Sequence, residues 1–224
     1  MTYQAATSTV PAASEHPSRT TRLRLICGIA AGPLYLVVSY AQAFTRQGFD
    51  LTRNAFSFLS LGDLGWIQVA NFVVCGLLFV VAATGMRRVL RSQPGGIWGP
   101  LLIAVMGLAM MTGGVFRTDP AFGYPPGTPD TKPHSLTWHA ALHAVSFTTA
   151  IVSWLIACLV FGRRFAVTEQ RWWAVYSLAT GLILLATVET LVAPPGALLI
   201  YIAATIGWTW TSAICLKLLR ESAR

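Results

Sequence analysis

The chain has 224 residues, of which 54% are hydrophobic and only 11% are charged. In soluble domains about a quarter of all residues are charged, so this composition argues strongly against a soluble single domain. The formal net charge of +8 does not indicate nucleic acid binding, because the Lys and Arg residues are strung between long uncharged segments and form no basic patch. We therefore expect a membrane protein without a nucleic acid partner.

Six segments are long and apolar enough to cross a bilayer. A hydrocarbon core about 30 Å thick needs roughly 20 apolar residues at helical rise. Lipid cannot satisfy the backbone polar groups, so such segments must be helical. The expected helices run from Leu25 to Phe44, Trp66 to Met86, Trp98 to Phe116, Trp138 to Phe161, Trp172 to Val192 and Ala197 to Leu216. The predicted fold class is all-α, a polytopic membrane helix bundle with six transmembrane helices.

The chain ends outside these segments are short. Residues 1–22 are rich in Thr, Ser, Ala and Pro and lack apolar periodicity, so we expect a disordered tail there. Residues 23–217 form the expected transmembrane domain, and residues 218–224 form a second short tail. The first apolar segment also resembles a signal peptide. Its length, together with Pro33 and the Gly28-x-x-x-Gly32 spacing, favours a helix that is retained and packs closely.

The positions of Lys and Arg predict the orientation, because cytoplasmic loops retain these residues. The connections on one side of the bundle hold only Arg46, Arg53, Arg117 and Lys132. Both termini are therefore expected in the cytoplasm, and the two longer connections, Thr45–Gly65 and Arg117–Thr137, on the outer face. The predicted location is the cell membrane, with multiple spans.

Ionisable side chains near the expected outer helix ends are candidate catalytic residues, because charge within a membrane span is costly and usually faces the bundle interior. Glu189 lies within a turn of the outer end of the fifth helix, where it could alternatively contact interfacial water. His139 and His143 share one face at the start of the fourth helix. Asp63 precedes the second helix and Asp119 follows the third. Either could instead cap a helix, and Asp119 could also form an ion pair with the nearby Arg.

These five residues come from four helix ends at about one depth, so we expect a shared site that opens outward. The i, i+4 spacing of the two histidines can chelate a metal. It lacks the Glu of an HExxH motif and a fixed third ligand, so we assign no metal. Acid–base chemistry, hydrogen bonding to substrate and simple packing stay open for the histidine pair. We expect no cofactor.

Aromatic and amide side chains supply candidate substrate-binding residues. The aromatic candidates near the same end are Trp66, Tyr124, Trp138, Tyr201 and Trp208. They either turn inward to line a pocket for a lipophilic substrate or form an interfacial aromatic belt. Gln68 and Asn71 in the second helix either contact substrate or form hydrogen bonds between helices. The expected partners are a lipophilic small molecule and membrane lipids, and the sequence predicts no particular oligomeric state.

Four stretches of the chain carry a family resemblance. They are Phe56–Gly62, Gly65–Phe72, Gly113–Gly127 and Trp138–His143. These stretches resemble the bacterial DUF998 family, a set of small six-helix membrane proteins whose function is not established. The positions that match the family pattern are Ser57, Ser60, Gln68, Asn71, Asp119 and His143. Asp63, His139 and Glu189 are not general features of that pattern, so they mark either a specialised member or incidental residues.

Two looser similarities concern arrangement alone. An Asp, a Ser and paired His near one membrane face resemble the zinc-dependent membrane hydrolases related to alkaline ceramidases. Acidic residues at an aromatic pocket resemble the membrane-bound terpene cyclases, in which a carboxylic acid protonates an alkene or epoxide. Neither comparison rests on a sequence motif.

The leading functional expectation is acid–base catalysis on a lipophilic substrate, first of all proton-initiated terpene cyclisation of an isoprenoid. Glu189 or Asp119 would donate the proton, with Asp63 as a second carboxyl. His139 and His143 would orient or reprotonate the donor. The alternatives are a non-catalytic lipid-binding, sensory or accessory subunit, and a metal-dependent membrane hydrolase.

Overall fold

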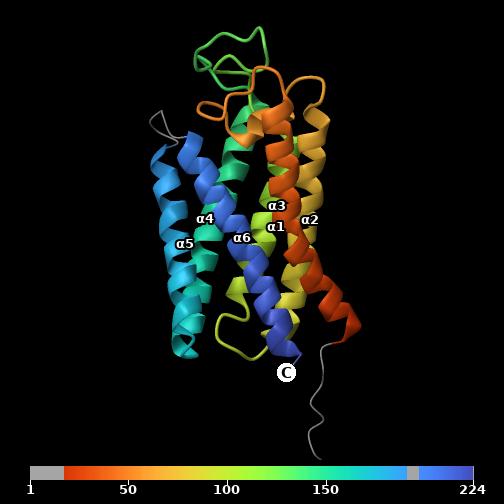
Figure 1. The fold of residues 1–224 in the computed structure, drawn as a ribbon, viewed down its shortest axis with the longest axis vertical. Helices are drawn as coiled ribbons and strands as arrows, with labels where there is room; N and C mark the ends of the chain where they lie inside the picture. The colour runs from red at the N-terminus through yellow and green to blue at the C-terminus, as the bar shows by residue number, and fades with distance from the viewer. Residues whose placement is uncertain (1–17, 191–196, 224) are drawn as a thin grey trace, which may run out of the picture.

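The computed structural model describes residues 18–190 and 197–223, which form six α-helices and one short 3₁₀-helix, with no strand among them (Figure 1). The elements are α1 (Arg19–Thr45), η1 (Phe56–Ser60), α2 (Gly65–Val89), α3 (Trp98–Val115), α4 (Trp138–Val167), α5 (Arg171–Thr190) and α6 (Ala197–Ser222). The predicted all-α bundle is confirmed.

The described helices also have the length and composition of membrane spans. Five of them, α1 to α4 and α6, are long and apolar enough to cross a membrane. The fifth in chain order, α5, is apolar as well, and its fully described part, Arg171–Ala186, is shorter. We conclude that the protein is a helical integral membrane protein.

Three helices extend beyond the apolar segments that the sequence marks. Helix α1 begins at Arg19 and not at residue 23, because the Ser18 hydroxyl caps it by accepting a hydrogen bond from the Thr21 N–H at 3.3 Å. Helix α4 continues to Val167. Helix α6 continues to Ser222, where Lys217 and Glu221 form an i, i+4 ion pair at 2.9 Å. Residues 19–22 and 218–222 are therefore helical, and the first 17 residues of the expected tail lie outside the described part.

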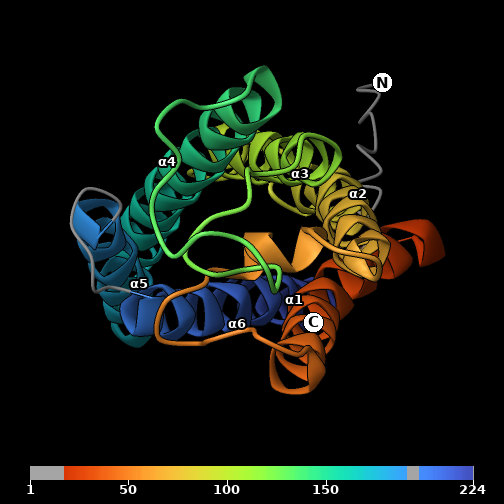
Figure 2. The ribbon, with the colours of Figure 1, turned by 90° about the horizontal axis from the view of Figure 1, so that it is seen from above.

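The helices form a closed ring in chain order, with α6 packed against α1 (Figure 2). Close contact between α1 and α6 depends on small residues: a Cβ atom at Gly32 would lie 2.6 Å from the Trp208 carbonyl oxygen. This packing agrees with the expectation from the Gly28-x-x-x-Gly32 spacing. The described chain ends lie at one end of the bundle. Residues 46–64 and 116–137 lie at the opposite end, which we call the long-loop end.

Candidate functional site

A cavity of about 100 Å³ lies inside the ring, toward the long-loop end. All six helices and η1 contribute to its walls, although they are far apart in sequence. Its lining is almost entirely apolar and aromatic. The lining includes Tyr35, Phe56, Ser57, Phe72, Met106, Met110, His143, Phe147, Trp154, Leu184, Ile200 and Trp208. The site is therefore a chamber of the whole bundle and not a cleft between two helices.

Aromatic rings form the part of the cavity wall nearest the middle of the bundle. The Trp208 ring centroid lies 4.2 Å from that of Trp154 and 4.8 Å from that of Tyr35. The Trp154 Nε1–H donates to the Thr211 hydroxyl at 2.9 Å, so its polar group is satisfied away from the cavity. Trp208, predicted from the sequence as a substrate-binding residue, thus lines the chamber.

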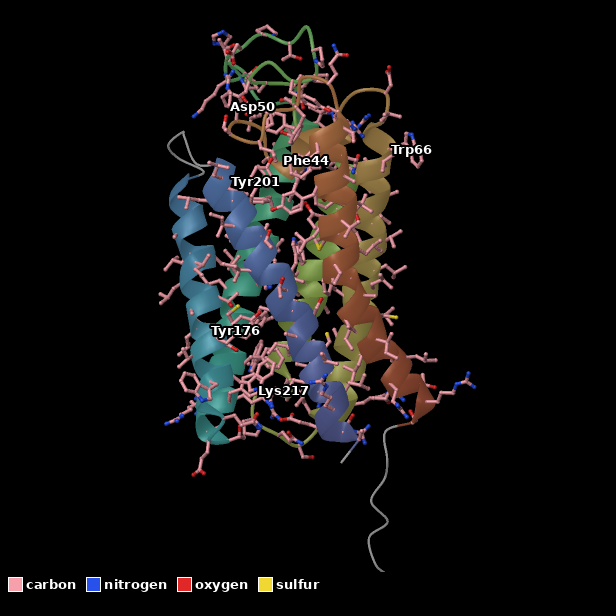
Figure 3. All side chains as sticks on the ribbon, in the orientation of Figure 1. Phe44, Asp50, Trp66, Tyr176, Tyr201 and Lys217 are labelled. Carbon is pink, nitrogen blue, oxygen red and sulfur yellow. The ribbon has the colours of Figure 1, made fainter. Side chains whose placement is uncertain are left out.

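The short helix η1 closes the cavity at the long-loop end and crosses the middle of the ring (Figure 2). Tyr201 of α6 holds it in place: its hydroxyl donates to the Asn54 carbonyl, and its ring packs edge-on against Phe56 with centroids 4.6 Å apart. Figure 3 shows Tyr201 close beneath the loops. Tyr201, also predicted to bind substrate, therefore fixes the roof of the chamber and does not line it.

His143 is the one predicted catalytic residue that lines the cavity among the described side chains. Its side chain is buried, and Nδ1 lies 2.8 Å from the Gly113 carbonyl oxygen and 2.9 Å from the Phe116 carbonyl oxygen. These oxygens belong to the last turn of α3, where carbonyl groups have no partner within the helix. The sequence places His143 here because its helix starts beside the end of α3.

Of the other predicted catalytic residues, Asp119, His139 and Asp63 lie away from the cavity lining. Asp119 accepts hydrogen bonds from the Thr137 N–H at 2.8 Å and the Thr137 hydroxyl at 2.6 Å, at the start of α4. Asp119 therefore holds Thr137, the N-cap residue of α4, and is not itself the cap. His139 is exposed and its ring lies 3.7 Å from that of Trp138. Asp63 is exposed in the turn before α2. Glu189 lies in the last turn of α5, and its side chain is outside the described part.

Two of the predicted aromatic residues point away from the bundle. Trp66 is 65% exposed and Trp138 is 64% exposed. Figure 3 shows Trp66 extending outward from the start of α2. Both match the alternative of an interfacial aromatic belt, in which the indole ring sits at the headgroup level.

Gln68 and Asn71 belong to a buried polar network between α1 and α2. The Gln68 side-chain oxygen accepts from the Gln42 amide at 2.8 Å, and the Asn71 amide donates to the Ser39 hydroxyl at 3.1 Å. The Asn71 amide also reaches the Tyr35 carbonyl at 3.2 Å. These side chains are satisfied by helix-to-helix contacts, as in the alternative that the sequence left open.

The loops over the roof are joined to each other. Arg53 forms an ion pair with Asp130 across the two long loops, and Tyr124 is buried with its hydroxyl 3.4 Å from Arg46 Nη1. The predicted substrate-binding residue Tyr124 thus lies in the loop layer above η1.

The first long loop also contains a carboxylate with a shifted pKa. Hydrogen bonds from Thr52 lower the pKa of Asp50. The carboxylate of Asp50 therefore stabilises the folded loop at neutral pH, and this stabilisation is lost as the pH falls through the lowered pKa.

A family model described as "Protein of unknown function (DUF998)" matches residues 29–217, from α1 to α6. The chain belongs to the DUF998 family. This confirms the resemblance noted in the sequence. Comparisons with curated proteins and with solved structures give no match.

The DUF998 match spans every element that lines the cavity, including residues that the sequence alone did not single out. Polar residues in the first apolar segment, Ser39 and Gln42, could have been found because they interrupt a hydrophobic run. The cavity-lining Met106, Met110 and Phe147 carry no such signal, since they look like ordinary core residues. Among the described side chains, no group of three or more His, Cys, Asp or Glu is placed to hold a metal ion.

Proposed function

We propose that this membrane protein binds a small lipophilic molecule, or one end of a longer one, in the central cavity. The observation that carries the proposal is an apolar, aromatic chamber built by all six helices, with one imidazole among its described lining side chains. Pockets that enclose a whole drug-sized ligand measure about 300–1,000 Å³. A chamber of about 100 Å³ suits a few carbon atoms of a chain, with the remainder lying between helices.

The wall offers a route from the bilayer. Phe147 of α4 and Ile200 of α6 both line the cavity and are only half-buried. Nearer the middle of the bundle, Trp154 bridges the same two helices through its hydrogen bond to Thr211. We place the entrance in the long-loop half of the wall that α4, α5 and α6 form, where these half-buried side chains lie.

Photolabelling with an alkyl diazirine that carries no hydroxyl tests the proposal in the purified protein in nanodiscs. We expect peptide mapping to find label on cavity-lining residues. Ala150 lines the cavity, so A150F fills it and should lower this labelling about tenfold, because cores of native density leave no room for an added ring.

The matched control is A144F on the same helix, since Ala144 faces outward and is exposed. Its cavity labelling should stay within about twofold of the wild type, because a ring added there displaces only lipid. Labelling confined to the outer surface, or equal cavity labelling in A150F and A144F, would contradict the proposal.

A second candidate is acid–base catalysis on an isoprenoid held in the same chamber. The observation that favours it is an imidazole at the wall of an aromatic cavity, since His is the most frequent general acid or base. Glu189 stays a predicted proton donor, whereas Asp119, the other predicted donor, binds Thr137 and does not line the chamber. Conversion of epoxidised farnesol in membranes should then fall at least about 100-fold in a variant that lacks the catalytic group. Equal turnover in H143N, D119N, E189Q and the wild type would remove this candidate.

A further inference from the structure

We propose that the ligand of the cavity is a lipophile with a hydrogen-bond donor at its polar end, such as an alcohol, and that this donor binds Nε2 of His143. This inference rests on the proposed function and adds the chemical class of the ligand. It follows from the way in which α3 holds the imidazole ring.

The two carbonyl groups at the end of α3 fix the hydrogen on Nδ1. A carbonyl oxygen only accepts hydrogen bonds, and Nδ1 lies within 2.8 and 2.9 Å of the Gly113 and Phe116 oxygens. Nδ1 must therefore be the donor. In a neutral imidazole the other nitrogen is then an acceptor.

His143 is buried in a membrane-spanning helix, and no carboxylate among the described side chains lines the cavity. The contacts of Nδ1 with the two carbonyl oxygens therefore assign the Nδ1–H tautomer, in which Nε2 is the acceptor.

Among the described residues, none forms a hydrogen bond with Nε2, and the ring edge that carries Nε2 is the edge turned away from the α3 carbonyls. An acceptor that stays unpaired in an apolar chamber loses its hydrogen bonds to water without compensation. A ligand that donates one hydrogen bond recovers this loss, whereas a ligand that only accepts does not.

Ser57, Tyr35 and Trp208 also line the chamber and carry polar groups. The hydroxyls of Ser57 and Tyr35 can donate as well as accept, so they do not discriminate between a donor and an acceptor on the ligand. The Trp208 Nε1–H only donates, so it cannot favour a ligand that donates. Among the described lining side chains, a preference for a donor on the ligand therefore comes from His143, and this separates His143 from Ser57 experimentally.

The experiment measures competition between unlabelled lipophiles and the alkyl diazirine for the cavity. The competitors are 1-octanol and its isomer 1-methoxyheptane, which have the same atoms but differ in whether they carry a donor. In the wild type we expect 1-octanol to compete more strongly. The ratio of the two half-inhibitory concentrations should change about five- to tenfold between wild type and the variant without Nε2, as expected for one hydrogen bond. Partitioning into the bilayer cancels because each competitor is compared across variants.

The informative variant is H143N. The Asn side-chain amide sits at the position of Nδ1 and can still donate to the Gly113 and Phe116 carbonyls, while Nε2 is removed. H143N should keep the labelling by the hydrocarbon probe and lose the preference for the alcohol. The matched control is H139N, one turn earlier on α4, where the ring is exposed. It should keep the preference, as should S57A.

The outcomes distinguish the two proposals. Absence of cavity labelling by the hydrocarbon probe overturns the proposed function and this inference with it. Cavity labelling with the same competitor ratio in wild type and H143N overturns only the inference. A preference that is lost in S57A and kept in H143N, or a preference for the ether, also overturns it.

A measurement on the unaltered protein covers the case in which H143N does not fold. The ¹⁵N shift of the His143 Nε2 should move on addition of 1-octanol and stay in place with 1-methoxyheptane. Equal shifts with both competitors would overturn the inference.

Discussion

Gln68 shows how one amide side chain can connect two helices in lipid. It is fully buried, and its oxygen lies within hydrogen-bond distance of the Gln42 amide at 2.8 Å and of the Asn71 amide at 3.3 Å. Its own amide donates to the Ser39 hydroxyl at 3.1 Å. Hydrogen bonds between membrane helices contribute about 0.6 kcal/mol each on average, so Gln68 stabilises the contact between α1 and α2 through the sum of several such bonds.

We expect Q68L to lower the free energy of unfolding by about 1–2 kcal/mol, because it leaves Gln42, Ser39 and Asn71 without their shared partner. The measurement is unfolding in mixed micelles of increasing denaturing detergent. T84V on the same helix is the control, since Thr84 is exposed and its hydroxyl bonds only to the Val81 carbonyl. A stability loss of the same size in both variants would show that the network contributes nothing specific.

The histidine pair marks the limit of what residue spacing predicts. The i, i+4 spacing correctly places both side chains near the end of one helix, but the structure buries His143 and exposes His139. The difference comes from the unpaired carbonyl groups at the end of α3, which attract one ring only. Contacts with another helix depend on the tertiary structure, and the spacing of residues along α4 does not predict them.

At the scale of elements, the contact between α2 and α3 depends on the absence of a side chain. A Cβ atom at Gly76 would lie 2.5 Å from the Gly107 carbonyl oxygen and 2.7 Å from Met111 Cγ. The first neighbour is backbone and cannot move aside without shifting a helix. In membranes such close approach provides the packing that holds helices together.

G76A should therefore lower the free energy of unfolding by about 1–3 kcal/mol, in spite of the better helix propensity of Ala. G113A on α3 is the control, because a Cβ there meets its nearest neighbour, Ser146 Cβ, at an ordinary 3.6 Å. It should be neutral or slightly stabilising. The same unfolding measurement checks both, and equal stabilities of the two variants would contradict the packing argument.

The helices could be predicted from the sequence, whereas the direction in which their side chains point and the short helix η1 that closes the cavity could not. Runs of apolar residues identified all six helices within a few residues of the observed ends, except where charged turns extend α1, α4 and α6. The five residues of η1 are too few to produce a periodic pattern. The outward direction of Trp66 and Trp138 also escaped prediction, because an aromatic residue at a helix end suits either a pocket or the interface.

At the scale of the molecule, the described chain ends lie at one end of the bundle and the two long loops at the other (Figure 1). This arrangement is required of six antiparallel spans. Which end faces the cytoplasm follows only from the distribution of Lys and Arg, so the orientation stays a prediction.

Labelling with a membrane-impermeant maleimide tests the orientation. H134C lies in the second long loop and S92C in the connection between α2 and α3, and both positions are exposed. We expect H134C to react in intact cells and S92C to react only after permeabilisation. The unaltered protein, whose four thiols lie within helices, is the control. The reverse pattern would invert the predicted topology.

Because every helix contributes to the walls of the cavity, ligand binding should affect the amount of this protein in a cell. A half-inserted chain has no such chamber, so a ligand binds only the completed bundle and shifts the balance toward it. At 100 times its dissociation constant, a ligand adds about 2.7 kcal/mol to stability. Membrane proteases remove loosened chains first, so the abundance of this protein should rise and fall with the supply of the molecule that it holds.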